Sequence, residues 1–302
     1  GETQSCVGCH EARTGAAAAA SGTLMALNRP ASEFEPVPGV PEVIDYPRDI
    51  QPVWDKHCVS CHSVETPSGR VVLTGDCNEW FTQSYYALFA YNQISDARRY
   101  QKDGNHPPRG FGTAASPLMK KIDGSHYGAK LAPRERDLVR LWVEAGATFP
   151  GTYAAYNHQS SAVAGAFSDT AEAKIGKPLG PIVERRCLAC HGSAAGLGQR
   201  VDKVRVNPLY TDSPANPWRG RVNLPRHCWN LYNLSHPEKS MILLAPLASQ
   251  AGGHQWCKDK DKDGRPLAVF RDTQDPDYQA ILQAVQDARA RQAKAGRYDL
   301  PG

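Results

Sequence analysis

The fold of this chain is decided by residues 47–62, which read PRDIQPVWDKHCVSCH. Side chains in this stretch recur at the spacing of one helix face, at Ile50, Val53, Trp54 and His57. The predicted helix runs directly into Cys58-Val-Ser-Cys61-His62, and Cys-x-x-Cys-His is the pattern by which c-type haem is attached. The two thiols can each form a thioether to the porphyrin, and His62 can then bind the iron as an axial ligand.

The same pentapeptide pattern occurs at two other places, with Cys6, Cys9 and His10 in one and Cys187, Cys190 and His191 in the other. Six of the nine cysteines are used in this way. The alternative is structural zinc, for which a Cys-x-x-Cys pair supplies half of a tetrahedral site. Three pairs would leave one without a partner, and zinc gives no role to the histidine that follows each pair. The sequence therefore predicts three covalent haems, with His10, His62 and His191 as proximal ligands.

Length and composition limit the architectures that the chain can adopt. The chain has 302 residues, enough for about two domains. Its 23 prolines and 26 glycines, with only 8% aromatic residues, indicate long irregular segments. The formal charge of +4 would be offset by haem propionates, so we expect no nucleic-acid partner.

The compartment follows from the haem motif. Haem attachment by this motif takes place outside the bacterial cytoplasm, which predicts a periplasmic or extracellular protein in a compartment that also permits disulfides. No run of about 18 consecutive apolar residues is present, so we expect no membrane span. The chain begins at Gly1 rather than Met, which predicts a mature protein after signal removal or a piece of a longer one.

A repeated plan divides the chain. The predicted parts are an N-terminal haem-binding segment and linker (1–47), a cytochrome c-like module (48–150), a linker (151–177) and a second cytochrome c-like module (178–302). Each module has a first helix, a haem motif, a loop, a short helix and a final helix. The predicted fold class is therefore mainly α, with tandem cytochrome c-like haem modules and long irregular loops.

Local sequence patterns predict where the later helices begin and end. The short helices are predicted at residues 116–122 and 238–244. The final helices are predicted at residues 133–145, ended by Gly146, and after Asp275, which acts as a cap followed by proline. The middle of the first module is expected to be rich in loops, with aromatic residues at Tyr85, Tyr86, Phe89 and Tyr91.

The distal ligands are predicted from the module plan. A haem used for electron transfer usually has a second His or Met ligand. That ligand is expected between the short helix and the final helix, which predicts His126 for the Cys58 haem. By the repeat, His254 is predicted for the Cys187 haem, with His236 as its rival. Met119 and Met241 are expected to fill the core.

For the first haem the predicted distal ligand is His57, which would dock that haem against the second one. The alternative is that His57 is a helix residue whose hydrogen bond is satisfied elsewhere. His106 and His158 are spare candidates.

Two smaller signals concern disulfides and calcium. Cys77, Cys228 and Cys257 are left over, and Cys228 is predicted to pair with Cys257 because both belong to the third-haem module. Residues 259–264 have the spacing of the first half of a calcium loop, with Asp259, Asp261, Asp263 and Gly264. Calcium is therefore a possible second cofactor. Position twelve is Phe270 rather than Glu, and a solvated run of alternating charges is the other interpretation.

Several segments resemble the multihaem C-terminal region of the hydrazine synthase alpha subunit family, namely residues 46–62, 73–76, 115–123, 244–253 and 275–278. The resemblance covers nearly the whole chain and implies haem-bearing modules. Members of that family usually carry a β-propeller upstream of this region. The family's namesake joins nitric oxide and ammonia at a haem that resembles the Cys58 site. There a Tyr shortly after the motif binds the haem and the motif His binds zinc, whereas residues 63–66 here contain no Tyr.

These observations lead to one main functional prediction and two alternatives. The prediction is a secreted or periplasmic three-haem c-type cytochrome that carries electrons between redox protein partners or further haem domains. The first alternative is a hydrazine synthase alpha-like enzyme of nitrogen redox chemistry, with an open or weakly ligated haem at Cys58 and His62. The second is a docking module in which haem supplies the core. The sequence does not fix the oligomeric state.

Overall fold

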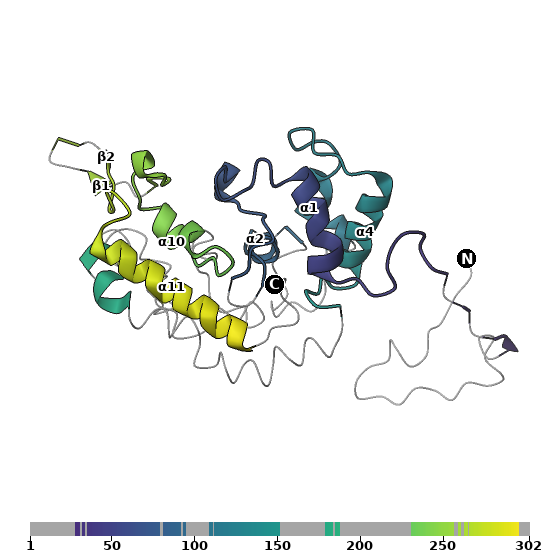
Figure 1. Cartoon of the computed structure of the whole chain (residues 1–302). Coiled ribbons are helices and arrows are strands. Elements are labelled where there is room, and N and C mark those ends of the chain that lie inside the picture. The colour runs from purple at the N-terminus through teal and green to yellow at the C-terminus, as the bar shows by residue number, and fades with distance from the viewer. Residues whose placement is uncertain are drawn as a thin grey trace, which may run out of the picture. The chain divides into compact units, whose positions relative to one another are not determined.

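The structure is a computed structural model that describes residues 28–30, 32, 33, 35–78, 81–91, 93, 94, 109, 110, 112–151, 179–183, 185–187, 231–256, 259, 260, 263, 264 and 266–295. These residues are mainly helical, with one two-stranded ladder, as Figure 1 shows. Contacts divide the chain into a unit Gly1–Pro38 and a unit Gly39–Gly302, and the elements named below belong to the second. The prediction of a mainly helical chain is confirmed.

The first predicted helix is present and begins about three turns before the haem motif. A π-helical turn, Tyr46–Ile50, continues without a break into α1, Gln51–His57. Asp45 caps the start, because its side chain accepts a hydrogen bond from the backbone N–H of Arg48. The face predicted from the spacing is the buried one, apart from His57, which is half-buried. The helix ends at Cys58, whose N–H donates to the Trp54 carbonyl at 2.8 Å.

The middle of the first module was expected to be loop-rich, and this was wrong around its aromatic residues. They form α2, Gln83–Ala90, and Thr82 caps it by accepting a hydrogen bond from the N–H of Tyr85. The later predictions are confirmed within a residue or two. The short helix is α3, Pro117–Lys121, and the final helix is α4, Pro133–Glu144. Gly146 follows α4 with a φ of 96°, the left-handed conformation that ends helices.

Aromatic rings fill the core of the first module. Tyr46 lies at its centre and is fully buried. Its ring packs edge-on against Tyr85 at 5.0 Å and lies 5.1 Å from Trp142, ring centre to ring centre. Its hydroxyl accepts a hydrogen bond from Trp54 Nε1 and donates one to Ser84 Oγ, both at 2.9 Å. The first and final helices are therefore joined through one tyrosine.

The two ends of the first module meet. The N–H of Tyr46 donates to the Phe149 carbonyl at 3.0 Å, and the N–H of Gly151 donates to Asp45 Oδ2 at 2.9 Å. The chain thus enters and leaves this module at one place.

The second module has a separate core. Residues 179–183 and 185–186 are helical and lead into Cys187, whose N–H donates to the Val183 carbonyl at 2.8 Å. The later elements are η8 (Pro237–Lys239), α10 (Met241–Leu244), η9 (Ser249–Ala251) and α11 (Pro276–Ala295), and α11 runs beside α10 in Figure 1. The predicted helix at residues 238–244 is broken at Ser240, whose ψ of 132° is extended. Asp275 caps α11, accepting from the N–H of Asp277 at 2.8 Å.

The segment with calcium-loop spacing forms a hairpin. Strands β1 (Asp259–Lys260) and β2 (Pro266–Leu267) pair antiparallel, and Gly264 lies between them with a φ of 76°. Phe270 is 1% exposed and packs in the second core. Calcium stays a prediction, because Asp261 lies outside the described residues.

Within the part of the chain that is described, no helix is long and apolar enough to span a membrane.

Candidate functional site

Cys58 and Cys61 lie on a tight turn at the end of α1. The N–H groups of Cys61 and His62 both donate to the Cys58 carbonyl, at 3.1 and 3.0 Å. Cys58 is half-buried and Cys61 is exposed, and neither is in a disulfide. Burial raises the pKa of the Cys58 thiol to about 11, with a further contribution from the nearby Cys61. The turn therefore presents two neighbouring reduced thiols, as thioether attachment requires.

His62 is held by the loop that follows it. Its Nδ1 lies 3.3 Å from the Val71 carbonyl, and the N–H of Leu73 donates to the His62 carbonyl at 2.8 Å. Since a carbonyl only accepts, Nδ1 carries the proton and Nε2 keeps its lone pair for a ligand. Burial lowers the pKa of His62, hydrogen bonds to the Val71 and Ser68 backbone oppose this, and the nearby His126 lowers it further. A neutral imidazole is the form that binds a metal.

His126 lies opposite His62. Their ring centres are 6.1 Å apart and their planes are inclined by only 12°. His126 sits at the corner of a hairpin turn, where its carbonyl accepts from the N–H of Ala129 at 2.9 Å. The next two residues, Tyr127 and Gly128, have φ values of 48° and 78°, as in a type I′ turn.

The spacing of these two histidines fits one metal ion between them. A metal binds an imidazole nitrogen at about 2 Å, and that nitrogen lies about 1 Å from its ring centre, so opposed ligands have ring centres about 6 Å apart. An offset stack of two rings also allows such a distance. The metal is favoured because His62 directly follows the two thiols and already has Nδ1 occupied. Cys58, Cys61, His62 and His126 thus fit a haem. Larger clusters of three or more His, Cys, Asp or Glu side chains are absent from the described residues.

His57 binds a carboxylate. Its Nε2 lies 2.8 Å from Glu135 Oε2, and the ammonium of Lys56 lies 2.7 Å from Glu135 Oε1. Glu135 also accepts from the N–H of Ala132 at 3.0 Å and so caps α4. Although partial burial raises it, the pKa of Glu135 lies below its usual range because Lys56 and His57 donate hydrogen bonds. This arrangement favours the structural alternative for His57.

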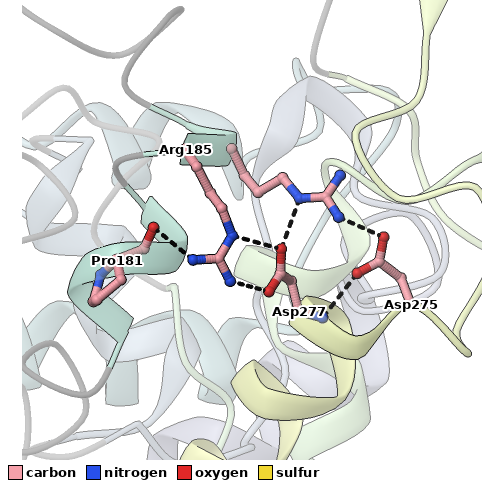
Figure 2. Close-up of polar contacts among 5 residues, drawn as sticks. Pro181, Arg185, Asp275 and Asp277 are labelled. Atoms are coloured by element: carbon pink, nitrogen blue, oxygen red, sulfur yellow. Dashed lines mark hydrogen bonds and ion pairs between the residues drawn. The ribbon is translucent and has the colours of Figure 1, made fainter.

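The second module has an equivalent contact. Asp277, in the first turn of α11, accepts hydrogen bonds from Arg185 and from Arg186 Nε, the latter at 2.8 Å (Figure 2). Arg186 Nη2 reaches Asp275 Oδ2 at 2.9 Å, and Arg185 Nη1 donates to the Pro181 carbonyl at 3.0 Å. In both modules, therefore, an acid at the start of the final helix binds the two residues that precede the first cysteine of the motif, Cys58 or Cys187. We call each of these contacts a helix clamp.

A pocket lies next to the second helix clamp. It has a volume of about 700 Å³, within the range of ligand pockets. Arg185, Arg186, Ala268, Val269, Arg271, Asp272, Gln274 and Asp275 line it. Val269 and Cys187 both pack against the second core. Only Ala268 and Val269 of the lining residues are apolar, and the rest are arginines, acids and a glutamine, so the pocket does not have the apolar walls that a porphyrin needs.

His254 is fixed by the backbone and has one unsatisfied atom. The N–H groups of His254 and Trp256 donate to the Leu244 and Ala245 carbonyls, both at 2.7 Å. A side chain at Gly253 would lie 2.4 Å from the Leu247 Cβ, so glycine is required beside it. His254 Nε2 is buried and has no hydrogen-bond partner. Burial lowers the pKa of His254, which a backbone hydrogen bond with Val64 partly offsets. An unpaired nitrogen on a neutral ring fits an axial ligand.

His236, the rival candidate, is held by Asp76 of the first module. Its Nδ1 lies 3.0 Å from Asp76 Oδ1, and its N–H donates to Asn233 Oδ1 at 2.8 Å. Its side chain is 51% exposed. Of the two candidates for the Cys187 haem, His254 has the more enclosed nitrogen.

Several predicted site residues lie outside the described residues, namely Cys6, Cys9, His10, Cys190 and His191, together with His106, His158, Cys228 and Cys257. The roles predicted for them stay predictions. Cys77 is described and is 3% exposed.

Sequence reasoning missed the helix clamps. They had a signal: a pair of basic residues precedes Cys58 and Cys187, and an acid stands in the first turn of each final helix.

Comparisons with family models, with curated proteins and with solved structures found no match. The likeness to the hydrazine synthase alpha subunit region thus stays an interpretation of the motifs.

Proposed function

We propose that the protein is a three-haem c-type cytochrome of the periplasm or cell exterior that carries electrons between redox partners. It consists of an N-terminal haem-binding segment and two tandem cytochrome c-like modules. The observation that carries the proposal is the parallel pair His62 and His126, 6.1 Å apart, beside Cys58 and Cys61. Bound haem supplies a one-electron couple whose potential is set by axial ligands, burial and hydrogen bonding.

The protein residues prepare this site in three ways. Cys58 and Cys61 would hold the porphyrin through thioethers. The Val71 carbonyl selects the tautomer of His62 and would make it a more basic ligand. His126, on its hairpin turn, would bind the iron together with His62. The aromatic core built on Tyr46 keeps α1 and α4 in fixed positions, so the site needs little rearrangement when the iron changes charge.

The enzyme alternative requires an open or weakly ligated haem at Cys58. His126 opposite His62 closes that position, so a substrate would have to displace it. Residues 63–66 also contain no Tyr that could replace the histidine. Electron transfer is therefore the better supported function.

The test is to replace His126 and count the irons of each spin state. In wild-type protein every haem with two strong axial ligands is low-spin and does not bind carbon monoxide when reduced. The change His126→Ala should convert one haem to high-spin and create one carbon monoxide site, as seen in electron paramagnetic resonance and absorption spectra. The matched control is Lys121→Ala, an exposed position at the end of α3, and it should leave both spectra unchanged.

Two results would contradict the proposal. If reduced wild-type protein binds carbon monoxide at the Cys58 haem, that haem is open and the enzyme alternative gains support. If the purified protein contains fewer than three haems per chain by the pyridine haemochrome assay, the three-haem assignment fails.

A further inference from the structure

The loop that follows the first module's haem motif contains a strained turn. Residues 68–71 form this turn, in which the N–H of Val71 donates to the Ser68 carbonyl at 3.2 Å. Its two central residues, Gly69 and Arg70, have φ values of 63° and 61°. Glycine adopts this left-handed conformation readily, whereas the Cβ of Arg70 makes it unfavourable. A residue with a side chain keeps such a φ only where its surroundings hold it in place.

The strained turn directs a carbonyl at His62. Arg70 directly precedes Val71, whose carbonyl lies 3.3 Å from His62 Nδ1. Two residues later, the N–H of Leu73 donates to the His62 carbonyl at 2.8 Å. The backbone conformation at Arg70 therefore sets the direction in which the loop reaches His62.

Arg70 is held from both modules. The hydroxyl of Tyr91, in the first module, donates to the Arg70 carbonyl at 3.0 Å. The Arg70 guanidinium lies over the ring of Trp256, in the second module, 5.2 Å from its centre. Trp256 is itself fixed, because its N–H donates to the Ala245 carbonyl at 2.7 Å. Since a cation is attracted to the face of an indole, Trp256 stabilises the strained turn from the second module.

We propose that Trp256 of the second module is a positioning residue for His62 of the first. By binding the Arg70 guanidinium it holds the strained turn, and the turn holds the Val71 carbonyl at His62 Nδ1. The proposal rests on the proposed function, in which His62 is an iron ligand, and adds that the second module tunes this ligand. A carbonyl that accepts from Nδ1 makes the imidazole more basic, and a more basic ligand favours the oxidised iron.

The experiment is a double-mutant cycle in the full-length holoprotein, read by amide hydrogen exchange. Glycine accepts a positive φ and has no guanidinium, so the turn in Arg70→Gly does not need the indole. Trp256→Leu should accelerate exchange of the Val71 and Leu73 amides about two- to fivefold, the effect of losing one exposed cation–π contact. In the Arg70→Gly background the same change should leave this exchange unaltered. Equal acceleration in the two backgrounds would overturn the inference.

The reduction potentials report on His62 itself. Trp256→Leu changes no charge, and it should raise the potential of one haem because the Nδ1 hydrogen bond is weakened. The indole also stacks on His254, but any effect through that contact is the same in both backgrounds and cancels in the comparison. A potential shift of the same size in the Arg70→Gly background would contradict the proposed role of Trp256.

A second pair of variants keeps the test decisive if Trp256→Leu does not fold. Arg70→Gln and Arg70→Gly change an exposed position and remove the same charge, but only glutamine has a Cβ that strains the turn. Exchange of the Val71 and Leu73 amides should be faster in Arg70→Gln than in Arg70→Gly. Equal or slower exchange in Arg70→Gln would also overturn the inference.

A control comes from a contact of the same loop that does not involve the turn. The Lys239 ammonium lies 2.7 Å from Glu65 Oε1, so Lys239→Gln removes another link between the modules. Its effect on exchange should be the same with Arg70 and with Arg70→Gly. The exchange measurements need no assumption about haem, whereas fewer than three haems per chain would contradict the proposed function, so the two failures are distinguishable.

Discussion

At the scale of single residues, one carboxylate decides what His57 does. Glu135 binds His57 Nε2, and the matching position in the second module, Arg186, binds Asp277 in the same way. A guanidinium cannot be a haem ligand, so the equivalence argues that both positions serve the helix clamp. The contact counts against His57 as the distal ligand of the predicted first haem, and that role stays a prediction.

The change His57→Gln tests this. We expect the number of low-spin haems to stay the same, because no iron loses a ligand. The free energy of unfolding should fall by about 1 kcal/mol, since a hydrogen bond to a charged, half-buried group is lost. Spin-state spectra and denaturant titration measure the two effects. Lys56→Gln is the control. It removes the more exposed ion pair of Lys56 with Glu135, so the free energy of unfolding should fall by at most about 1 kcal/mol. A new high-spin iron in His57→Gln would show that His57 is a ligand after all.

Residue-level prediction from the sequence depended on local spacing and on the module plan. Cys58, Cys61 and His62 are neighbours in the chain, and His126 lies opposite His62 with ring centres 6.1 Å apart, where the plan expected a distal ligand, but their roles as haem ligands stay predictions. The carboxylate partner of His57 was not foreseen. Glu135 is far from it in the chain, and only the crossing of two helices brings them together.

At the scale of elements, each helix clamp ties the start of the final helix to the turn that bears the haem cysteine. In the second module the clamp is close to neutral, with two guanidiniums facing two carboxylates (Figure 2). The acids lie at the start of α11, where the helix dipole also favours negative charge.

Removing the Asp277 carboxylate should weaken the contact between the start of α11 and the helix that leads into Cys187. Asp277→Asn leaves two guanidiniums with fewer acceptors, and Asp277 is only 9% exposed, so the free energy of unfolding should fall by about 1–3 kcal/mol. The control is Asp287→Asn on the same helix, an exposed position whose carboxylate accepts from the exposed Gln283. Equal losses in the two variants would mean that the helix clamp contributes little.

The same carboxylate predicts a pH dependence. Hydrogen bonds from Arg185, and then from Arg186, keep the pKa of Asp277 below its usual range despite burial, with Asp275 also facing this cluster. A carboxyl whose pKa is lower in the folded state stabilises the fold when it is ionised. Its contribution is complete above about pH 5 and is lost as the pH falls through the folded-state pKa. Asp277→Asn should therefore unfold with a weaker acid dependence than wild type between about pH 5 and pH 3.

The sequence did not predict α2, and the burial of this helix explains why. Residues 83–88 of α2 are all buried, so apolar and polar residues do not alternate with a helical period. Amphipathic spacing found α1, α4 and α11 because each has a solvent face. It could not find a helix that is enclosed on every side, and Thr82 was the one local sign of its start.

At the scale of the whole molecule, a second contact joins the two modules. Residues 231–236 lie against residues 76–83, and the N–H of Leu234 donates to the Cys77 carbonyl at 2.7 Å. Asp76 is central, because its oxygens accept from Asn233 Nδ2 at 2.7 Å and contact His236 Nδ1 at 3.0 Å. The side chain of Asp76 is 17% exposed.

Asp76→Ala should loosen the two modules from each other. Because each has its own core, we expect thermal unfolding to broaden or separate into two transitions, with a loss of about 1–3 kcal/mol in the less stable module. Differential scanning calorimetry of the holoprotein measures both. Asp137→Ala, on the exposed side of α4, should leave the thermogram unchanged. A single sharp transition in Asp76→Ala would show that the modules unfold together without this contact.

The two ends of the first module meet at Tyr46 and Phe149. This has a consequence for how such a protein arises. A segment whose two ends are adjacent can be copied or transplanted within a gene without displacing what lies on either side of it. The recurrence of the same plan further along the chain is what one duplication of this cassette would leave behind. Longer chains with more modules could then be made by adding copies.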